Sequence, residues 1–243
     1  MKWHESDIGH RLERLLEANA CWRDPTRELR NLSPWLAPLQ RWQSRRLAAS
    51  FADFIAAPGT RDATTFFLTD LYGDHDVSAR DRDVSRVMPM MKRVLPDELL
   101  GTAADAIELA VLSHGFDLRV ATALEPLLPG SVDESRLDAG TYAEAYRRAG
   151  LPRLRTRQID LIVRIGSTLD AAVHKPWLAR LLRASRLPAR VAGLGALQGF
   201  LERGFAAFAK MDDAGAFMAE IARREGEVSR RLFAGVAQPF ALS

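Results

Sequence analysis

The spacing of apolar residues is the feature that most constrains the fold of this chain. Apolar side chains recur at steps of three and four residues along most of its length, and runs with the strict alternation of a half-buried strand are missing. Steps of three and four place side chains on one face of an α-helix. We therefore predict an all-α protein, a compact irregular bundle of about eight to ten helices.

Proline, glycine and capping patterns predict where the helices begin and end. Thr141 and Glu144 have the spacing of a capping box, and Pro89 is expected to kink the helix that contains it. The better-defined expected helices cover residues 61–72, 96–125, 141–149, 152–173, 176–187, 191–211 and 215–233.

The length of 243 residues suits one large domain or two closely packed ones. Prolines and glycines are concentrated between residues 126 and 140, which makes this stretch the best candidate for a boundary. Each half would be small for an independent helical core. We predict a single domain over residues 1–243, with an internal connector at 126–140.

Charge and composition exclude several classes of protein. Lysine and arginine total 34 against 31 acidic residues, and a net charge of +3 creates no strong field for nucleic acid. Cys21 is the single cysteine, which rules out an internal disulfide and suits a reducing compartment. Charges run through the first fifteen residues, and no apolar stretch approaches the roughly 20 residues of a membrane span. We predict a soluble cytoplasmic protein without membrane or specific nucleic-acid partners.

Two local strings are distinctive. FFLTDLYG occupies residues 66–73, with further acidic and basic residues up to position 83, and LGALQGFLERGF occupies residues 194–205. Both resemble strings of an uncharacterised bacterial all-helical protein family that carries FFLxDLYGxxD. That family has no assigned activity, so the resemblance implies a helical fold and transfers no catalytic residue.

Asp70 lies in the first of these strings, among aromatic and leucine side chains that cannot all share one narrow stripe. The short helix is therefore expected to be buried around most of its circumference, and Asp70 with it. A buried carboxylate requires a partner, and the expected one is Arg80, Arg82 or Arg86. On this interpretation Asp70 is a structural corner between two helices.

The alternative is that the same region forms a functional site. Its candidate residues are Asp70, Tyr72, Asp76, Arg80 and Asp81. Their spacing does not match a calcium-binding EF-hand loop, and we predict no metal site.

His114 is the histidine most clearly placed on an apolar helical stripe, after Ile107 and Val111. The spacing predicts an inward-facing side chain, either a hydrogen-bonded core histidine or the ligand of a cofactor. The chain has no HExxH motif and no pair of ExxH motifs, which disfavours zincin and di-iron sites.

Glycines inside the expected 191–211 helix require compensation, because each costs about 1 kcal/mol relative to alanine. We expect this helix to be central, with Gly195 and Gly199 packed against another helix. A second interpretation has both glycines facing a flat ligand. Haem-oxygenase-like proteins combine a glycine-rich helix above haem with a histidine below it, and Gly195, Gly199 and His114 are the corresponding candidates.

Five arginines lie within eleven residues around an expected helix–turn–helix junction. They are Arg147, Arg148, Arg153, Arg155 and Arg157. The following helix is too apolar to read a DNA groove. We expect solvated helix ends beside carboxylates, with an anionic ligand as the alternative.

The favoured function is that of a non-catalytic cytoplasmic scaffold or protein-interaction protein, with a protein partner or a second copy of the chain. The alternative is a ligand- or haem-binding helical enzyme of haem-oxygenase-like type. No cofactor is predicted under the first interpretation, and whether the protein is an enzyme is left open.

Overall fold

The computed structural model describes residues 3–71, 83–84, 86–88, 92, 95–211 and 213–241. The all-α prediction is confirmed: the described residues form helices and connecting turns, without a strand. The main α-helices are α1 (Trp3–Arg23), α2 (Leu36–Ser50), α3 (Ala52–Ala56), α4 (Pro58–Phe66), α6 (Asp97–Leu127), α7 (Ala139–Ala149), α8 (Pro152–Val173), α9 (Pro176–Ala184), α10 (Arg186–Val191), α11 (Gly195–Phe208) and α12 (Ala214–Ala234). Short 3₁₀ helices cover Leu29–Leu32 and Glu134–Arg136, and α4 continues into a π-helical turn at Phe67–Leu71.

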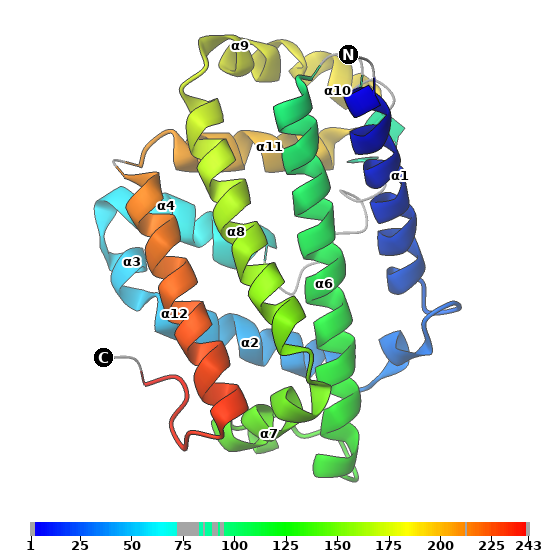
Figure 1. The fold of residues 1–243 in the computed structure, drawn as a ribbon, viewed down its shortest axis with the longest axis vertical. Helices are drawn as coiled ribbons and strands as arrows, with labels where there is room; N and C mark the ends of the chain where they lie inside the picture. The colour runs from blue at the N-terminus through cyan, green and yellow to red at the C-terminus, as the bar shows by residue number, and fades with distance from the viewer. Residues whose placement is uncertain are drawn as a thin grey trace.

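Helix α6 is a central helix that packs against α1, α2, α7 and α8. It packs against α1 on one side and α8 on the other, and α12 lies along the far side of α8 (Figure 1). Helices α2, α4 and α11 cross behind this layer, while α7 packs on the end of α6. Two layers of helices thus face each other across the interior.

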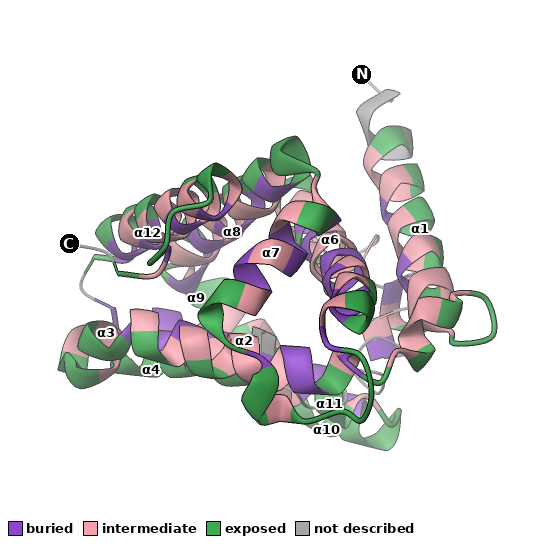
Figure 2. Ribbon diagram, turned by 90° about the horizontal axis from the view of Figure 1, so that it is seen from below, coloured by how far each residue is buried: buried purple, intermediate pink, exposed green. Residues whose placement is uncertain are grey.

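The apolar interior has two main clusters. One joins α4, α8, α11 and the first half of α12 with Leu47 of α2 and Leu109 of α6, and the other joins α2, α6, α7 and the second half of α12. Purple buried segments face inward from both layers in Figure 2. Phe217 and Leu232 lie in different clusters on the same helix, so α12, like α2 and α6, contributes to both.

Gly166 allows α8 and α12 to approach closely. A Cβ atom at this position would lie 1.8 Å from Sδ of Met218, which is fully buried. Any larger residue at Gly166 therefore has to displace Met218 or the helix itself.

Two expected helix ends are wrong. Pro126 does not end α6, which continues to Leu127; the amide of Leu128 still donates to the carbonyl of Leu124, so proline removes only one bond of the last turn. The α7 helix is capped by Asp138, whose carboxylate accepts from the Thr141 amide, and not by Thr141.

The expected 191–211 helix is also wrong at its start. Gly193 adopts a left-handed φ of 69°, which separates α10 from α11. The expected 176–187 helix is divided in the same region, at Ser185. The predicted kink at Pro89 and the predicted helix end at residues 72–73 lie outside the described residues.

Within the described part of the chain, no helix is both long enough and apolar enough to cross a membrane. The single-domain organisation stays a prediction.

Candidate functional site: a central cavity

A cavity of about 480 Å³ lies between the two layers of helices. Its walls come from α1, α2, α4, α6, α7, α8, α11 and α12, so segments far apart in the sequence line one space. Most of the wall is apolar, with side chains such as Phe67, Ile107 and Phe217. Polar lining residues from α2, α6, α7, α8 and α12 add charged and hydrogen-bonding groups; among them are Gln40, Arg46, Ser113, His114, Asp117, Tyr146, Arg155, Gln158, Glu225 and Ser229.

The turn between α7 and α8 positions Arg155. Gly150 and Leu151 both have left-handed φ angles, 68° and 64°, and Pro152 then begins α8. This sharp turn places Arg155 in the first turn of α8, where its side chain contacts Phe116 of α6 and Tyr146 of α7. Arg155 also precedes Ile162 by seven residues, so it lies on the inward stripe of its helix.

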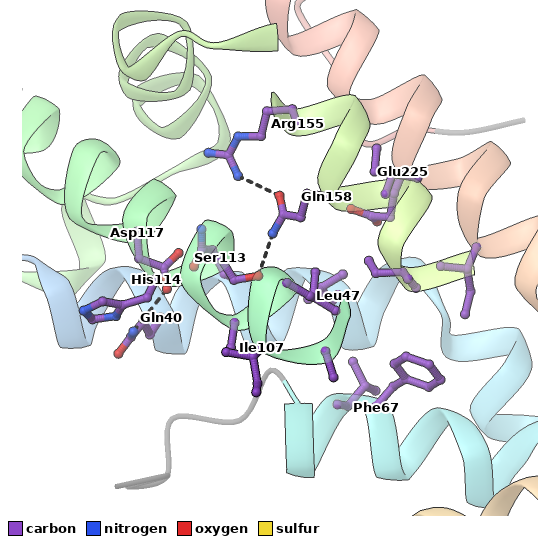
Figure 3. A pocket seen from close by; sticks show the side chains of 18 of the residues that line it. Gln40, Leu47, Phe67, Ile107, Ser113, His114, Asp117, Arg155, Gln158 and Glu225 are labelled. Atoms are coloured by element: carbon purple, nitrogen blue, oxygen red, sulfur yellow. Dashed lines mark hydrogen bonds between the residues drawn. The ribbon is translucent and has the colours of Figure 1, made fainter. Parts of the chain in front are cut away.

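The guanidinium of Arg155 is enclosed between two aromatic rings. It lies 3.7 Å from the ring centre of Phe116 and 4.4 Å from that of Tyr146. Its Nη1 donates to Oε1 of Gln158 over 3.4 Å, and Gln158 donates in turn to Oγ of Ser113 over 2.8 Å (Figure 3). The plane of the guanidinium is thereby fixed.

The remaining polar atoms of Arg155 are unsatisfied. The side chain is 7% exposed, yet Nε and Nη2 are buried without a hydrogen-bond partner. Burial of an uncompensated cationic group is expensive, and nearly all buried polar groups in proteins are paired.

Asp117 is close enough to Arg155 for the positive charge to lower the pKa of its carboxyl, although no salt bridge joins the two side chains in the described part of the chain. Its Oδ2 accepts from Nε2 of Gln40 over 3.1 Å. Burial raises the pKa of the Asp117 carboxyl above its ordinary value, and the Gln40 bond opposes that shift only in part.

The other acidic group of the cavity wall is already neutralised. Arg46 binds Glu225 through both terminal nitrogens, at 2.6 and 3.1 Å, and both side chains are largely buried. Nearby, the Tyr146 hydroxyl shares a hydrogen bond of 2.9 Å with Ser229. Burial raises the pKa of the Tyr146 hydroxyl, so this group is neutral near pH 7.

His114 faces inward, as predicted, and lines the cavity. Asn31 donates both amide hydrogens, to the carbonyls of Trp22 and Glu28, which leaves its Oδ1 as an acceptor for Nε2 of His114 over 2.8 Å. Nε2 therefore carries the imidazole proton. Ligation of haem iron by Nε2 would break this bond, and the haem alternative stays a prediction without support from the imidazole geometry.

The two distinctive sequence strings meet outside the polar part of the cavity. Asp70 is buried, as predicted, and its Oδ1 accepts from Nη2 and Nε of Arg203 over 2.5 and 2.9 Å. Arg86, one of the expected partners, donates from its Nη2 to the carbonyl of Ala192. The other candidates of this group, Tyr72, Asp76, Arg80 and Asp81, and the expected partner Arg82, lie outside the described residues.

Asp83 provides a second link between the same strings. This buried carboxylate accepts from the amide of Leu197 over 3.2 Å, in the open first turn of α11. Asp83 thus caps a helix from another part of the chain. Its role was not anticipated from the sequence.

The expected positions of two glycines are wrong. Among the described residues, no atom lies within 4 Å of the Cβ position of Gly195, and the contact given for Gly199 is Nη1 of Arg203 on its own helix. Neither glycine lines the cavity. Gly204 is the glycine of α11 that is packed against another helix, with Cζ of Phe66 at 2.9 Å from its Cβ position.

The arginines around the α7–α8 turn behave in two ways. Arg147 and Arg148 bind Glu144, and Arg157 binds Glu108, as expected for helix ends beside carboxylates. Arg155 does not fit that expectation, because it is buried. Its place on the apolar stripe of α8 is the signal in the sequence that could have identified it as a buried residue.

No group of three or more histidine, cysteine, aspartate or glutamate side chains in the described ranges is arranged to hold a metal ion. Comparison with curated proteins and with solved structures finds no match to the chain. A family model described as "Domain of unknown function (DUF8198)" matches residues 23–239, which is most of the chain. The protein therefore belongs to this family of domains of unknown function.

Proposed function

We propose that this protein binds a small organic molecule in its central cavity. The observation that carries the proposal is the cavity itself, about 480 Å³ in volume, with an apolar wall and a small set of polar groups from α2, α6, α7, α8 and α12. Ligand sites in proteins have volumes of about 300–1,000 Å³ and this combination of lining groups.

Binding, and not catalysis, is what the lining supports. Glu225 is held by Arg46, and Nε2 of His114 is committed to Asn31. A carrier, sensor or ligand-dependent interaction protein is compatible with such a site. The prediction of a scaffold with a protein partner or a second copy stays open beside this proposal.

A neutral apolar dye tests the proposal without presupposing the charge of the ligand. We expect N-phenyl-1-naphthylamine to bind the purified protein with a stoichiometry near one and with blue-shifted emission. Ala110→Phe inserts a large ring from α6 into the cavity and is expected to abolish dye binding. The matched control is Ala171→Phe, at an exposed position of α8 that does not line the cavity.

Absence of dye binding to the parent protein would overturn the proposal. So would unchanged binding by an Ala110→Phe protein that retains the parent's helical circular dichroism. If that variant loses helicity, Ala106→Leu is the smaller cavity-filling change on the same wall. Native mass spectrometry of the protein purified under mild conditions identifies any ligand that remains bound.

A further inference from the structure

We infer that the exposed face of α9 and α10 is a docking surface for an acidic segment of a partner protein, one in which leucine or aromatic side chains lie beside aspartate or glutamate. We call this surface the basic face. It is defined by six exposed residues of the two helices: Trp177, Arg180, Arg183, Leu187, Arg190 and Val191. None of them lines the cavity, so the inference goes beyond the proposed function and gives the predicted protein partner a place on the molecule.

The basic face carries positive charge that the described part of the chain does not balance. Between Ala171 and Leu201 the sequence has five lysine and arginine residues and no acidic one. Nε of Arg180 and Nε of Arg183 each donate to a carbonyl of their own helix, over 3.3 and 3.2 Å. Among the described residues, no carboxylate pairs with either of them or with Arg190. Because all three arginines are exposed, they attract an anionic partner to this end of the molecule.

Two aliphatic side chains project beside these charges. Leu187 is 70% exposed and Val191 is 82% exposed, which makes them the two most exposed large apolar side chains of the described residues. They are four positions apart on α10 and form one row, next to a second row that contains Arg186 and Arg190. A helix with leucine beside glutamate is complementary to these two rows. Trp177 adds an exposed aromatic ring, and tryptophan and arginine are the residue types most enriched at the energetic centres of protein interfaces.

Contacts with α11 hold the basic face in place. Nε2 of the buried Gln198 donates to the carbonyl of Leu182 over 2.8 Å, and its Oε1 accepts from the hydroxyl of Ser185 over 3.1 Å. Glu202 of α11 binds Arg186 over 2.6 Å. The junction between α9 and α10 is therefore fixed before a partner arrives, which reduces the entropy lost on binding.

Two other occupants fit the basic face less well. A bilayer is broad, and α6 begins at the same end of the molecule with exposed Asp97 and Glu98, which an anionic lipid surface would meet (Figure 1). A two-fold pair with a second copy would bring the same arginines face to face, and like charges repel. A narrow acidic segment avoids both costs, because it covers the two rows and leaves the start of α6 uncovered.

The experiment is selection from a phage-displayed library of random peptides of about 16 residues, or about four helical turns. The full-length parent protein is the bait, and the triple variant Arg180→Gln, Arg183→Gln and Arg190→Gln serves for counter-selection. We expect the enriched peptides to contain aspartate or glutamate clustered beside leucine or aromatic residues. In fluorescence anisotropy, synthetic copies should bind the parent about tenfold or more tightly than the triple variant, and binding should weaken as the salt concentration rises.

A second triple variant is the matched control. It combines Arg27→Gln, Arg136→Gln and Arg153→Gln, which removes the same charge from exposed positions outside the basic face, and it should bind the peptides as the parent does. Leu187→Ser combined with Val191→Ser tests the apolar row without a change of charge. We expect this variant to weaken peptide binding by about tenfold or more.

Selected peptides without acidic residues would overturn the inference, and this result needs only the parent protein. So would the absence of enrichment over the triple variant of the basic face, or equal peptide binding by that variant. Co-sedimentation with vesicles of phosphatidylglycerol and phosphatidylcholine that this variant loses would overturn it in favour of a bilayer. Self-association in sedimentation velocity that the double serine variant abolishes would overturn it in favour of a second copy. Dye binding tests the proposed function and peptide binding tests this inference, so the two can fail separately.

Discussion

The guanidinium of Arg203 lies 2.5 Å from the carboxylate of Asp70, although 133 residues separate the two in the chain. One comes from the FFLTDLYG string and the other from the LGALQGFLERGF string, so this contact joins the two most distinctive segments of the sequence. Phe66 and Phe200, from the same two strings, also pack together, with ring centres 5.3 Å apart.

Arg203→Ala is expected to destabilise the protein by about 1–3 kcal/mol, because it removes a charged donor from the buried Asp70 carboxylate. The measurement is urea unfolding followed by circular dichroism. In a double-mutant cycle with Asp70→Ala, the two effects should be clearly less than additive. Arg223→Ala is the control: its pair with Glu220 lies within one helix at the surface, and its unfolding curve should stay close to that of the parent.

Gly204→Ala and Gly195→Ala are predicted to have opposite effects, although both replace a glycine of α11. The first places a Cβ 2.9 Å from the ring of Phe66 and is expected to cost about 1–3 kcal/mol through overpacking. The second meets no atom of the described residues and should be neutral or stabilising by about 0.4–1 kcal/mol, since alanine restricts the unfolded chain. Thermal unfolding of both variants gives the comparison; a more stable Gly204→Ala protein would contradict the packing of α11 on α4.

The raised pKa of the Asp117 carboxyl should make the stability of the protein depend on pH. Its folded-state pKa is raised above its ordinary value of 3.8, so the folded protein retains this proton at pH values where the unfolded chain has lost it. Stability therefore falls as pH rises through the interval above 3.8. Asp117→Asn should melt at a higher temperature than the parent at pH 7, and the difference should shrink towards pH 4.

Asp133→Asn supplies a control of opposite sign. Hydrogen bonds from Ser135 lower the pKa of Asp133, so ionised Asp133 contributes stability that is lost as pH falls. This variant should be slightly less stable than the parent at neutral pH. A melting difference for Asp117→Asn that does not vary between pH 4 and 7 would contradict the burial of Asp117.

Because Arg46 and Glu225 neutralise each other, we expect that removing one of them destabilises the protein more than removing both. Arg46→Ala leaves Glu225 as a largely buried, unpaired charge and is expected to cost about 3–5 kcal/mol. Arg46→Met combined with Glu225→Met removes both charges and should be more stable than Arg46→Ala. Chemical unfolding distinguishes these outcomes. A double variant less stable than Arg46→Ala would contradict the explanation that an unpaired charge on Glu225 destabilises the single variant.

Local patterns in the sequence predict the helices and several inward-facing residues. The stripe through Ile107 and Val111 placed His114 in the interior, and the aromatic residues around position 70 placed Asp70 there. Gly150 and Pro152 marked the turn between α7 and α8. Each of these features depends on neighbours within a few residues.

Contacts between distant segments were not predictable in this way. Arg203 was not identified as the partner of Asp70, because side-chain pairing across α4 and α11 leaves no periodic signal. Arg155 was grouped with solvated arginines, because a charged residue on an apolar stripe is ordinarily assigned to the surface. Gly193 was placed inside a helix, although a glycine there ends one by adopting a conformation that other residues avoid.

The cap that Asp83 gives to α11 has a consequence for how the protein can be divided. The first turn of α11 receives its side-chain acceptor from a residue 114 positions earlier, and Leu194, its own N-cap residue, supplies none. A fragment that begins after residue 83 therefore lacks part of what completes this helix. A truncation at the connector 126–140 would remove this acceptor, so the first turn of α11 should be less stable in a C-terminal fragment than in the full chain.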